Sequence, residues 1–197
     1  MLNKDSKNSN KNLSSFLKLL NQNQKMKLWI KTLLSAYSNL PEIIKSVDKI
    51  IELNASSLSF TSDIYNAEKS TYAQVERVID LTERKNKLLN IYLIAKNLFS
   101  SVSEEDRIFL KRKYVYNWTA EDLATEYNVS IRTIFRRTEK LIDKIYETIS
   151  RRNWSINFIN LQVKGEAWLC ERFNKFARDS MQYSPIEENV NYSEKEY

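Results

Sequence analysis

The scarcity of glycine and proline is the sequence feature that most restricts the fold. The 197 residues include one Gly and two Pro. Tight β-turns depend on these residues, whereas the abundant Leu, Ile, Lys and Glu are compatible with long helices. We therefore predict an all-α fold that consists of a helical N-terminal part, a helix-turn-helix and a C-terminal amphipathic helix. The length allows one helical domain of ordinary size or two small ones.

Missing residue types exclude several classes of enzyme. The chain has no His, so a His-containing catalytic triad and a His-ligated metal site are both impossible. One Gly rules out a glycine-rich phosphate-binding loop. The acidic residues fall mostly on polar sides of the predicted helices. We therefore expect no enzymatic activity, no cofactor and no bound metal.

Several features favour a cytoplasmic protein. The single cysteine, Cys170, cannot form an internal disulfide, which fits a reducing compartment. No apolar run is long enough to span a bilayer, so no membrane partner is expected. The polar first twelve residues lack the apolar core of a signal peptide. Because Cys170 lies in an apolar run, we predict that its side chain is buried.

Charge and hydrophobic spacing divide the chain into five segments. Residues 1–12 and 182–197 are polar and are predicted to be disordered, the second as an acidic tail. Residues 13–100 form a helical N-terminal region, 101–152 a helix-turn-helix domain, and 153–181 a C-terminal helical extension. The extension is rich in aromatic residues, so it either packs on the helix-turn-helix or forms a contact with a partner.

The N-terminal region contains signals for helix boundaries. Pro41 fits the first turn of a helix. The Ser-, Thr- and Asn-rich run Asn54–Asp63 is predicted to be a linker. Thr71 and Gln74 have the spacing of a capping box, which would begin a long helix.

Two questions about this long helix remain open from the sequence alone. The polar run Thr82–Lys87 separates two apolar clusters. It fits one continuous helix with a polar turn, but it also fits a break or a surface that pairs with another helix. The apolar residues themselves would form either a core or a seam between two copies of the chain. A homodimer is therefore one expected arrangement.

The stretch Ser103–Ile149 has the spacing of a helix-turn-helix. Ser103, Thr119 and Ser130 are each placed to cap a helix. Asn128 falls in the turn, where a left-handed backbone is needed and Asn is the most tolerant residue after Gly. Ala124 allows two helices to cross closely. Inward-facing side chains are expected at Leu123, Tyr127, Val129, Ile134 and Leu141.

The second helix of this motif has a basic outer face. A recognition helix places its N-terminal residues against base edges in the major groove, where Arg can bind guanine with two hydrogen bonds. Lysines and arginines farther from the bases contact phosphates, which positions the protein without reading sequence. We assign base contacts to Ile131, Arg132, Thr133 and Arg136. We assign phosphate contacts to Thr119, Arg137 and Lys140.

The segment from Val102 to Lys140 resembles region four of bacterial sigma factors and the related small sigma-like regulators of phages and mobile elements. The matching residues are Val102-Ser103-Glu104, Lys113-Tyr114, Glu121-Asp122-Leu123-Ala124, Asn128-Val129-Ser130, and Thr133-Ile134 with Arg136-Arg137. The resemblance covers about a fifth of the chain. Asn117 and Asn128 stand where the family commonly has Gly, Ser103 where it has Pro, and Arg112 where it has an apolar residue.

The resemblance implies contact with promoter DNA and with RNA polymerase. Residues 1–100 contain no recognisable counterpart of the sigma region that melts the −10 element. We therefore predict a sequence-specific DNA-binding transcriptional regulator with double-stranded DNA as partner, and with RNA polymerase as a further partner. The net charge of +6 agrees with a nucleic-acid partner. Two alternatives remain: a phage DNA-packaging or replication accessory protein, and a protein-interaction module.

Overall fold

The computed structural model describes residues 12–57, 64–152 and 154–183. Every regular element in these ranges is a helix, which confirms the all-α prediction. Helical residues 12–19 precede α2 (Gln22–Ala36), α3 (Leu40–Ser57), α4 (Ile64–Ser100), α5 (Glu104–Tyr114), α6 (Ala120–Glu126), α7 (Ile131–Ser150), α8 (Ile156–Val163) and α9 (Ala167–Tyr183). The segments predicted to be disordered fall largely outside the described residues.

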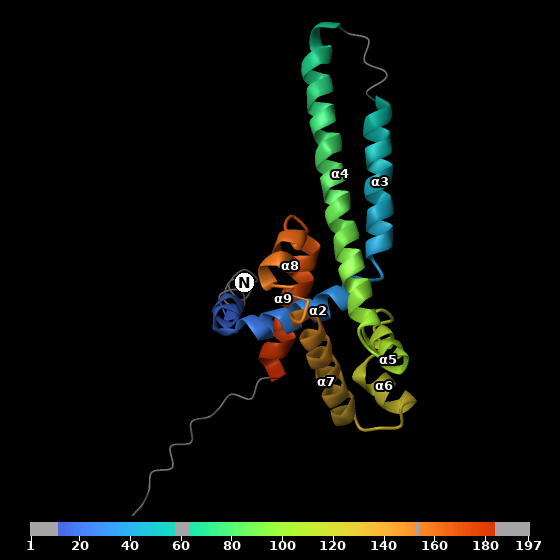
Figure 1. The fold of residues 1–197 in the computed structure, drawn as a ribbon, viewed down its shortest axis with the longest axis vertical. Helices are drawn as coiled ribbons and strands as arrows, with labels where there is room; N and C mark the ends of the chain where they lie inside the picture. The colour runs from blue at the N-terminus through green and yellow to red at the C-terminus, as the bar shows by residue number, and fades with distance from the viewer. Residues whose placement is uncertain (1–11, 58–63, 153, 184–197) are drawn as a thin grey trace, which may run out of the picture.

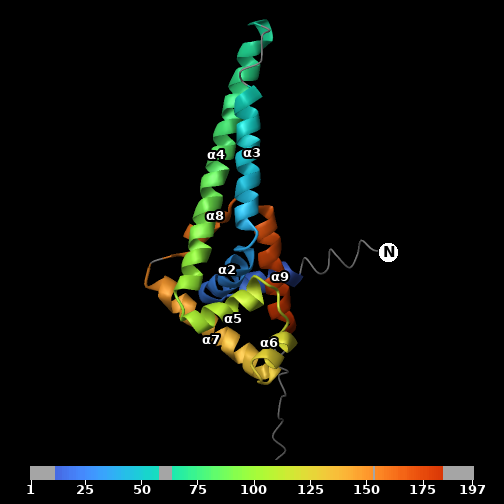
Figure 2. The ribbon, with the colours of Figure 1, turned by 90° about the vertical axis from the view of Figure 1, so that its right-hand side faces the viewer.

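Helices α3 and α4 form a long hairpin that projects from a body built by the other helices (Figure 1). Helix α4 has 37 residues, which corresponds to about 55 Å at 1.5 Å per residue. The turn between α6 and α7 lies at the opposite end of the molecule from the hairpin tip, in both views (Figures 1 and 2). The predicted DNA-binding motif therefore forms one end of an elongated molecule.

Helix α2 crosses the middle of the body and contacts α4, α5, α7, α8 and α9. A capping box between Asn21 and Gln24 fixes its beginning. Ile30 and Leu34 are almost completely buried, and they belong to a core that also includes Leu98 and Ile142. Apolar packing is thus continuous across the predicted boundary near residue 100.

The linker predicted at Asn54–Asp63 is wrong for its first four residues, because α3 continues to Ser57. Polar side chains in this turn do not disrupt the helix. Asn54 Nδ2 donates to the carbonyl of Ile50 at 2.7 Å, and Ser56 Oγ donates to that of Glu52 at 2.8 Å. Residues 58–63 lie outside the described ranges. At the other end of α3, Pro41 occupies the first turn, as predicted.

The capping box predicted at Thr71 and Gln74 is also wrong, because both residues lie inside α4. Helix α4 runs without a break through Thr82–Lys87, which answers the question left open by the sequence. Ion pairs with α3 and with the residue before α9 hold this polar turn. Lys85 pairs with Asp48 of α3, and Arg84 Nε lies 2.7 Å from Glu166 Oε1.

Glu166 ties the base of the hairpin to the start of α9. Its side chain is 3% exposed and accepts two hydrogen bonds from Arg84 and one from Trp168 Nε1. Burial by itself raises the pKa of Glu166, but these hydrogen bonds outweigh burial, and the pKa lies below its ordinary value. The carboxylate therefore stays ionised and fixes α4 to the body.

The C-terminal extension packs mainly on α2. The Trp29 and Phe173 rings lie 4.4 Å apart between centroids, and Phe176 reaches Tyr114 of α5 at 6.1 Å. The prediction that Cys170 is buried is wrong, because α9 turns Leu169 into the core and leaves Cys170 exposed. None of the described helices is long and apolar enough to cross a membrane.

Candidate nucleic-acid interface

All three predicted caps of the helix-turn-helix are confirmed. The backbone N–H groups of Asp106 and Thr133 donate to the side chains of Ser103 and Ser130, at 3.3 and 3.2 Å. Asp122 N donates to Thr119 Oγ1 at 3.1 Å. Each cap satisfies a donor that the helix itself leaves unpaired. Local hydrogen bonds thus fix where α5, α6 and α7 begin.

The turn between α6 and α7 adopts the predicted left-handed backbone. Asn128 has φ of 49°, and the N–H of Val129 donates to the carbonyl of Ala124 at 3.0 Å. The prediction that Val129 fills the core is wrong. Its side chain is 39% exposed, and Leu123 and Ile134, at 0% and 1%, close the core instead.

The N-terminal half of α7 presents three cations to solvent. Arg132, Arg136 and Lys140 are exposed, and none forms an ion pair within the described part of the chain. Ile131 is 41% exposed beside them. Thr133 is also exposed, although its hydroxyl lies 2.9 Å from that of Ser130. The structure therefore brings all four predicted base-contacting residues onto the accessible first turns of α7.

Arg137 does not project with these residues, so the prediction that it lies on the basic outer face of α7 is wrong. Its guanidinium lies over the rings of Phe109 and Tyr127, at 4.7 and 5.2 Å from their centroids. Nη2 donates to Glu105 at 2.8 Å and to Asp106 at 3.1 Å. Arg137 points toward α5 because it lies on the flank of α7 rather than on its outer side. We assign it a structural role.

Thr119 has no free donor for a phosphate. Its hydroxyl and its backbone N–H both donate to Asp122 Oδ2, at 2.8 and 2.9 Å. The capping carboxylate therefore occupies the position that a phosphate would need, and its charge repels an anion. Of the three residues to which we assigned phosphate contacts, Lys140 alone remains a candidate.

Arg112, where the sigma family has an apolar residue, is accommodated by aromatic rings. Its guanidinium lies 5.0 Å from the centroid of Trp118 and 5.5 Å from that of Tyr127, and it pairs with Glu126 at 2.8 Å. Tyr127 thus contacts two arginines, Arg112 and Arg137. The sequence pattern missed this cluster. The only indication of this cluster in the sequence was the presence of aromatic residues close to Arg112 and Arg137 along the chain.

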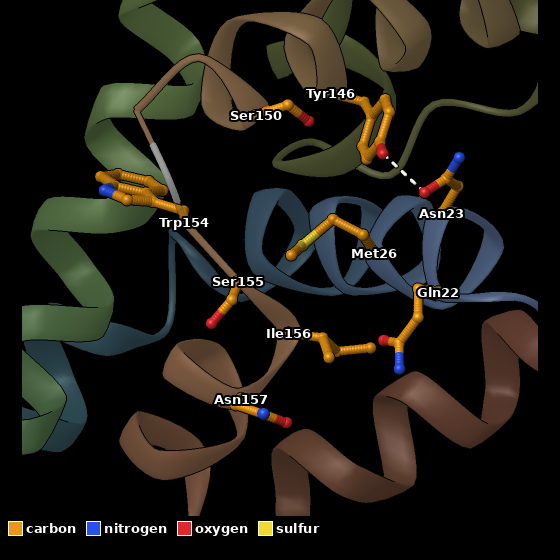
Figure 3. A pocket seen from close by; sticks show the side chains of 9 residues that line it. All are labelled: Gln22, Asn23, Met26, Tyr146, Ser150, Trp154, Ser155, Ile156 and Asn157. Atoms are coloured by element: carbon orange, nitrogen blue, oxygen red, sulfur yellow. Dashed lines mark hydrogen bonds between the residues drawn. The ribbon is translucent and has the colours of Figure 1, made fainter.

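Helix α2 covers one side of α7 from Glu139 onward. Lys31 pairs with Glu139 at 2.7 Å and Lys27 with Asp143 at 2.6 Å. Tyr146 donates to Asn23 Oδ1 at 2.7 Å, beside a cavity of about 320 Å³ (Figure 3). The nine residues that line this cavity carry no acidic, basic or thiol side chain. It offers no acid–base pair for catalysis.

No protein-family model, curated protein or solved structure matches this chain. The residues of the site themselves must therefore indicate the function. No cluster of three or more Cys, Asp or Glu able to hold a metal ion occurs within residues 12–57, 64–152 and 154–183. The accessible chemistry of the helix-turn-helix is that of Arg132, Arg136 and Lys140.

Replacing Arg137 with alanine should lower the free energy of unfolding by about 1–2 kcal/mol, because two ring contacts and two partly screened ion pairs are lost. Urea denaturation measures this change. The adjacent variant Arg136→Ala is the matched control and should change stability by less than about 0.5 kcal/mol. Unchanged stability with weakened DNA binding in Arg137→Ala would restore the phosphate-contact assignment.

The same contact gives the stability a pH dependence. Burial by itself raises the pKa of Asp106, but hydrogen bonds from Ser103 and Arg137 outweigh it, and the pKa is lowered. A lowered folded-state pKa stabilises the folded chain above the unfolded pKa. That contribution is lost as the pH falls through the folded-state pKa.

Proposed function

We propose that this protein is a sequence-specific DNA-binding regulator of transcription that acts in the cytoplasm. One observation carries the proposal: Arg132, Arg136 and Lys140 are exposed and unpaired on the first turns of the second helix of a helix-turn-helix. A helix in this position enters the major groove with its N-terminal end. Arg132 and Arg136 read base edges, Ile131 and Thr133 contact thymine methyl groups, and Lys140 contacts a phosphate.

The arrangement of α2 supports this mode of entry. It leaves the first turns of α7 accessible and covers the side of the helix that carries Glu139 and Asp143. Lys27 and Lys31 neutralise these carboxylates, which would otherwise repel the phosphate backbone. The resemblance to sigma region four supports promoters as the place of action and RNA polymerase as a protein partner. Regulation at promoters is therefore the role that we propose.

Genomic immunoprecipitation with sequencing of the bound DNA tests this proposal. Peaks centred on promoters with a shared sequence motif are the expected result. Binding to non-specific DNA should also weaken with salt. On non-specific DNA, where Arg132, Arg136 and Lys140 would each contact a phosphate, the affinity should fall roughly 40-fold between 50 and 200 mM salt. Absence of DNA binding at low salt would overturn the proposal.

The projecting hairpin favours a second candidate, a DNA-packaging or replication accessory protein. Such a protein holds DNA with the same motif while another part of the chain assembles. The exposed apolar side chains on the hairpin, including Leu53 and Ile79, are the observation that favours it. A large closed ring in solution, together with binding that shows no preference for promoters, would support this candidate over the first.

A further inference from the structure

Helix α4 carries a third stripe of residues, separate from the two sides that pack within the molecule. Lys85 and Leu88 lie on the side that faces α3, where Lys85 pairs with Asp48. Arg84 and Ile91 lie on the side that faces the body, where Arg84 pairs with Glu166. The third stripe consists of Tyr72, Val75, Ile79, Thr82, Asn86, Leu89 and Leu93.

The spacing of this stripe alternates between three and four residues throughout. That is the a/d pattern of a coiled-coil heptad, sustained over about three heptads. Five of the seven positions are apolar, and the other two are Thr82 and Asn86. Packing against α3 and against the body does not require a heptad pattern of apolar residues on this third side of α4. The stripe therefore has the composition of a seam.

The described part of the chain leaves most of this seam uncovered. Tyr72 is 75% exposed, Ile79 53% and Leu93 52%, and Val75 is 42% exposed. Thr82 and Asn86 are exposed as well, while Leu89 is half-buried. Several large apolar side chains exposed along one side of a helix mark an interaction surface more often than a solvated face.

We propose that the occupant is a second copy of this chain, whose α4 pairs in parallel with the first. Parallel pairing in register places Asn86 opposite the same residue of the partner and Thr82 likewise. All five apolar positions then meet identical apolar positions. An Asn at an a position is the residue that specifies register and two-stranded pairing in parallel coiled coils, because the two amides hydrogen-bond to each other.

Charge disfavours one antiparallel arrangement of the seam. An antiparallel arrangement with Ile79 opposite Thr82 places Asn86 against Val75. It also brings Glu76 of each copy against Glu83 of the other. Glu76 and Glu83 occupy e positions beside the seam. This arrangement therefore contains two Glu76–Glu83 pairs of like charge, which repel each other. In the parallel arrangement, Glu76 and Glu83 face the uncharged Thr71 and Val78.

The parallel dimer places both bodies at the same end of the paired hairpins. The two α7 helices then lie on the same side, as two half-sites of DNA require. The pairing itself does not depend on DNA binding, because no residue of the seam belongs to α7. A failure of one proposal therefore leaves the other standing.

Sedimentation velocity of the full chain tests the pairing. We expect a reversible dimer, and the double variant Val75→Glu/Ile79→Glu should raise its dissociation constant on the order of 100-fold, because unpaired carboxylates would be buried against each other. Leu53→Glu is the matched control. Leu53 is 62% exposed on α3 of the same hairpin but lies outside the seam, so the dimer should persist. Circular dichroism shows whether each variant keeps its helicity.

Cysteine cross-linking tests the orientation. In a Cys170→Ser background, Ile79→Cys should form a disulfide between two copies under mild oxidation, because parallel pairing places the two side chains face to face. The antiparallel arrangement with Ile79 opposite Thr82 would instead require the combination of Ile79→Cys with Thr82→Cys. A wild-type chain that stays monomeric at high concentration, a ring larger than a dimer, a dimer that survives Val75→Glu/Ile79→Glu, or cross-linking only in the combined variant would each overturn the proposal.

Discussion

Replacing Arg132 and Arg136 together with alanine should weaken binding to the cognate DNA site by at least about 30-fold. Each bidentate contact between an arginine and a guanine contributes about 1–3 kcal/mol of discrimination, and the two arginines lie one turn apart on the accessible part of α7. Fluorescence anisotropy with cognate and scrambled duplexes measures the change. The preference for the cognate duplex should be lost, whereas Lys140→Ala should weaken binding to both duplexes about equally.

A matched control is available at the other end of the same helix. Arg151 and Arg152 are exposed at the C-terminal end of α7, and their replacement by alanine removes the same charge. This control should reduce affinity only by the non-specific electrostatic effect and should keep sequence preference. Equal losses in the two double variants would show that net charge, rather than the groove contacts that we assign to Arg132 and Arg136, determines binding.

Leu34→Ala should lower the free energy of unfolding by about 2–5 kcal/mol, because the side chain is fully buried and its removal leaves a cavity. Leu34 lies in α2, which contacts both the hairpin and the helix-turn-helix. We therefore expect the whole chain to unfold in one transition shifted to lower denaturant concentration.

Two probes in different parts of the chain test this cooperativity. Far-ultraviolet circular dichroism follows all helices, while a fluorophore attached to the helix-turn-helix follows that part alone. The two transitions should coincide in both the wild type and the Leu34→Ala variant. Leu53→Ala, at an exposed position of the hairpin, should change stability by less than about 0.5 kcal/mol. Separate transitions would show that residues 101–152 fold as an independent domain.

Several predictions that depend on a few neighbouring residues succeeded, although the equally local predictions of a capping box at Thr71 and Gln74 and of a linker from Asn54 were wrong. The caps at Ser103, Thr119 and Ser130 and the left-handed turn at Asn128 each depend on contacts within about five residues, so the sequence contains the necessary information. The helical class followed from composition for the same reason, because helix propensity is a local property.

Predictions that depend on distant partners failed. Nothing within a few residues of Arg137 reveals that Glu105 and Asp106 lie beside it, since those residues are more than 30 positions earlier. Cys170 was misplaced because helical spacing defines an apolar side only to within one residue. Thr119 differs from these cases. Its pairing with Asp122 was predicted. The same pairing uses the hydroxyl and the backbone N–H of Thr119, which would otherwise be available to a phosphate.

The continuity of α4 connects the distal part of the hairpin to the body through one rigid element. One unbroken helix runs from the distal part of the hairpin to Ser100, three residues before the cap of α5. The ion pair between Arg84 and Glu166 holds α4 to the body about midway along the length of the helix. A force that a partner applies near the tip would therefore be transmitted along α4 to the body that contains α7. Distances measured by paired spin labels on α4 and α7 would show whether α7 moves relative to α4.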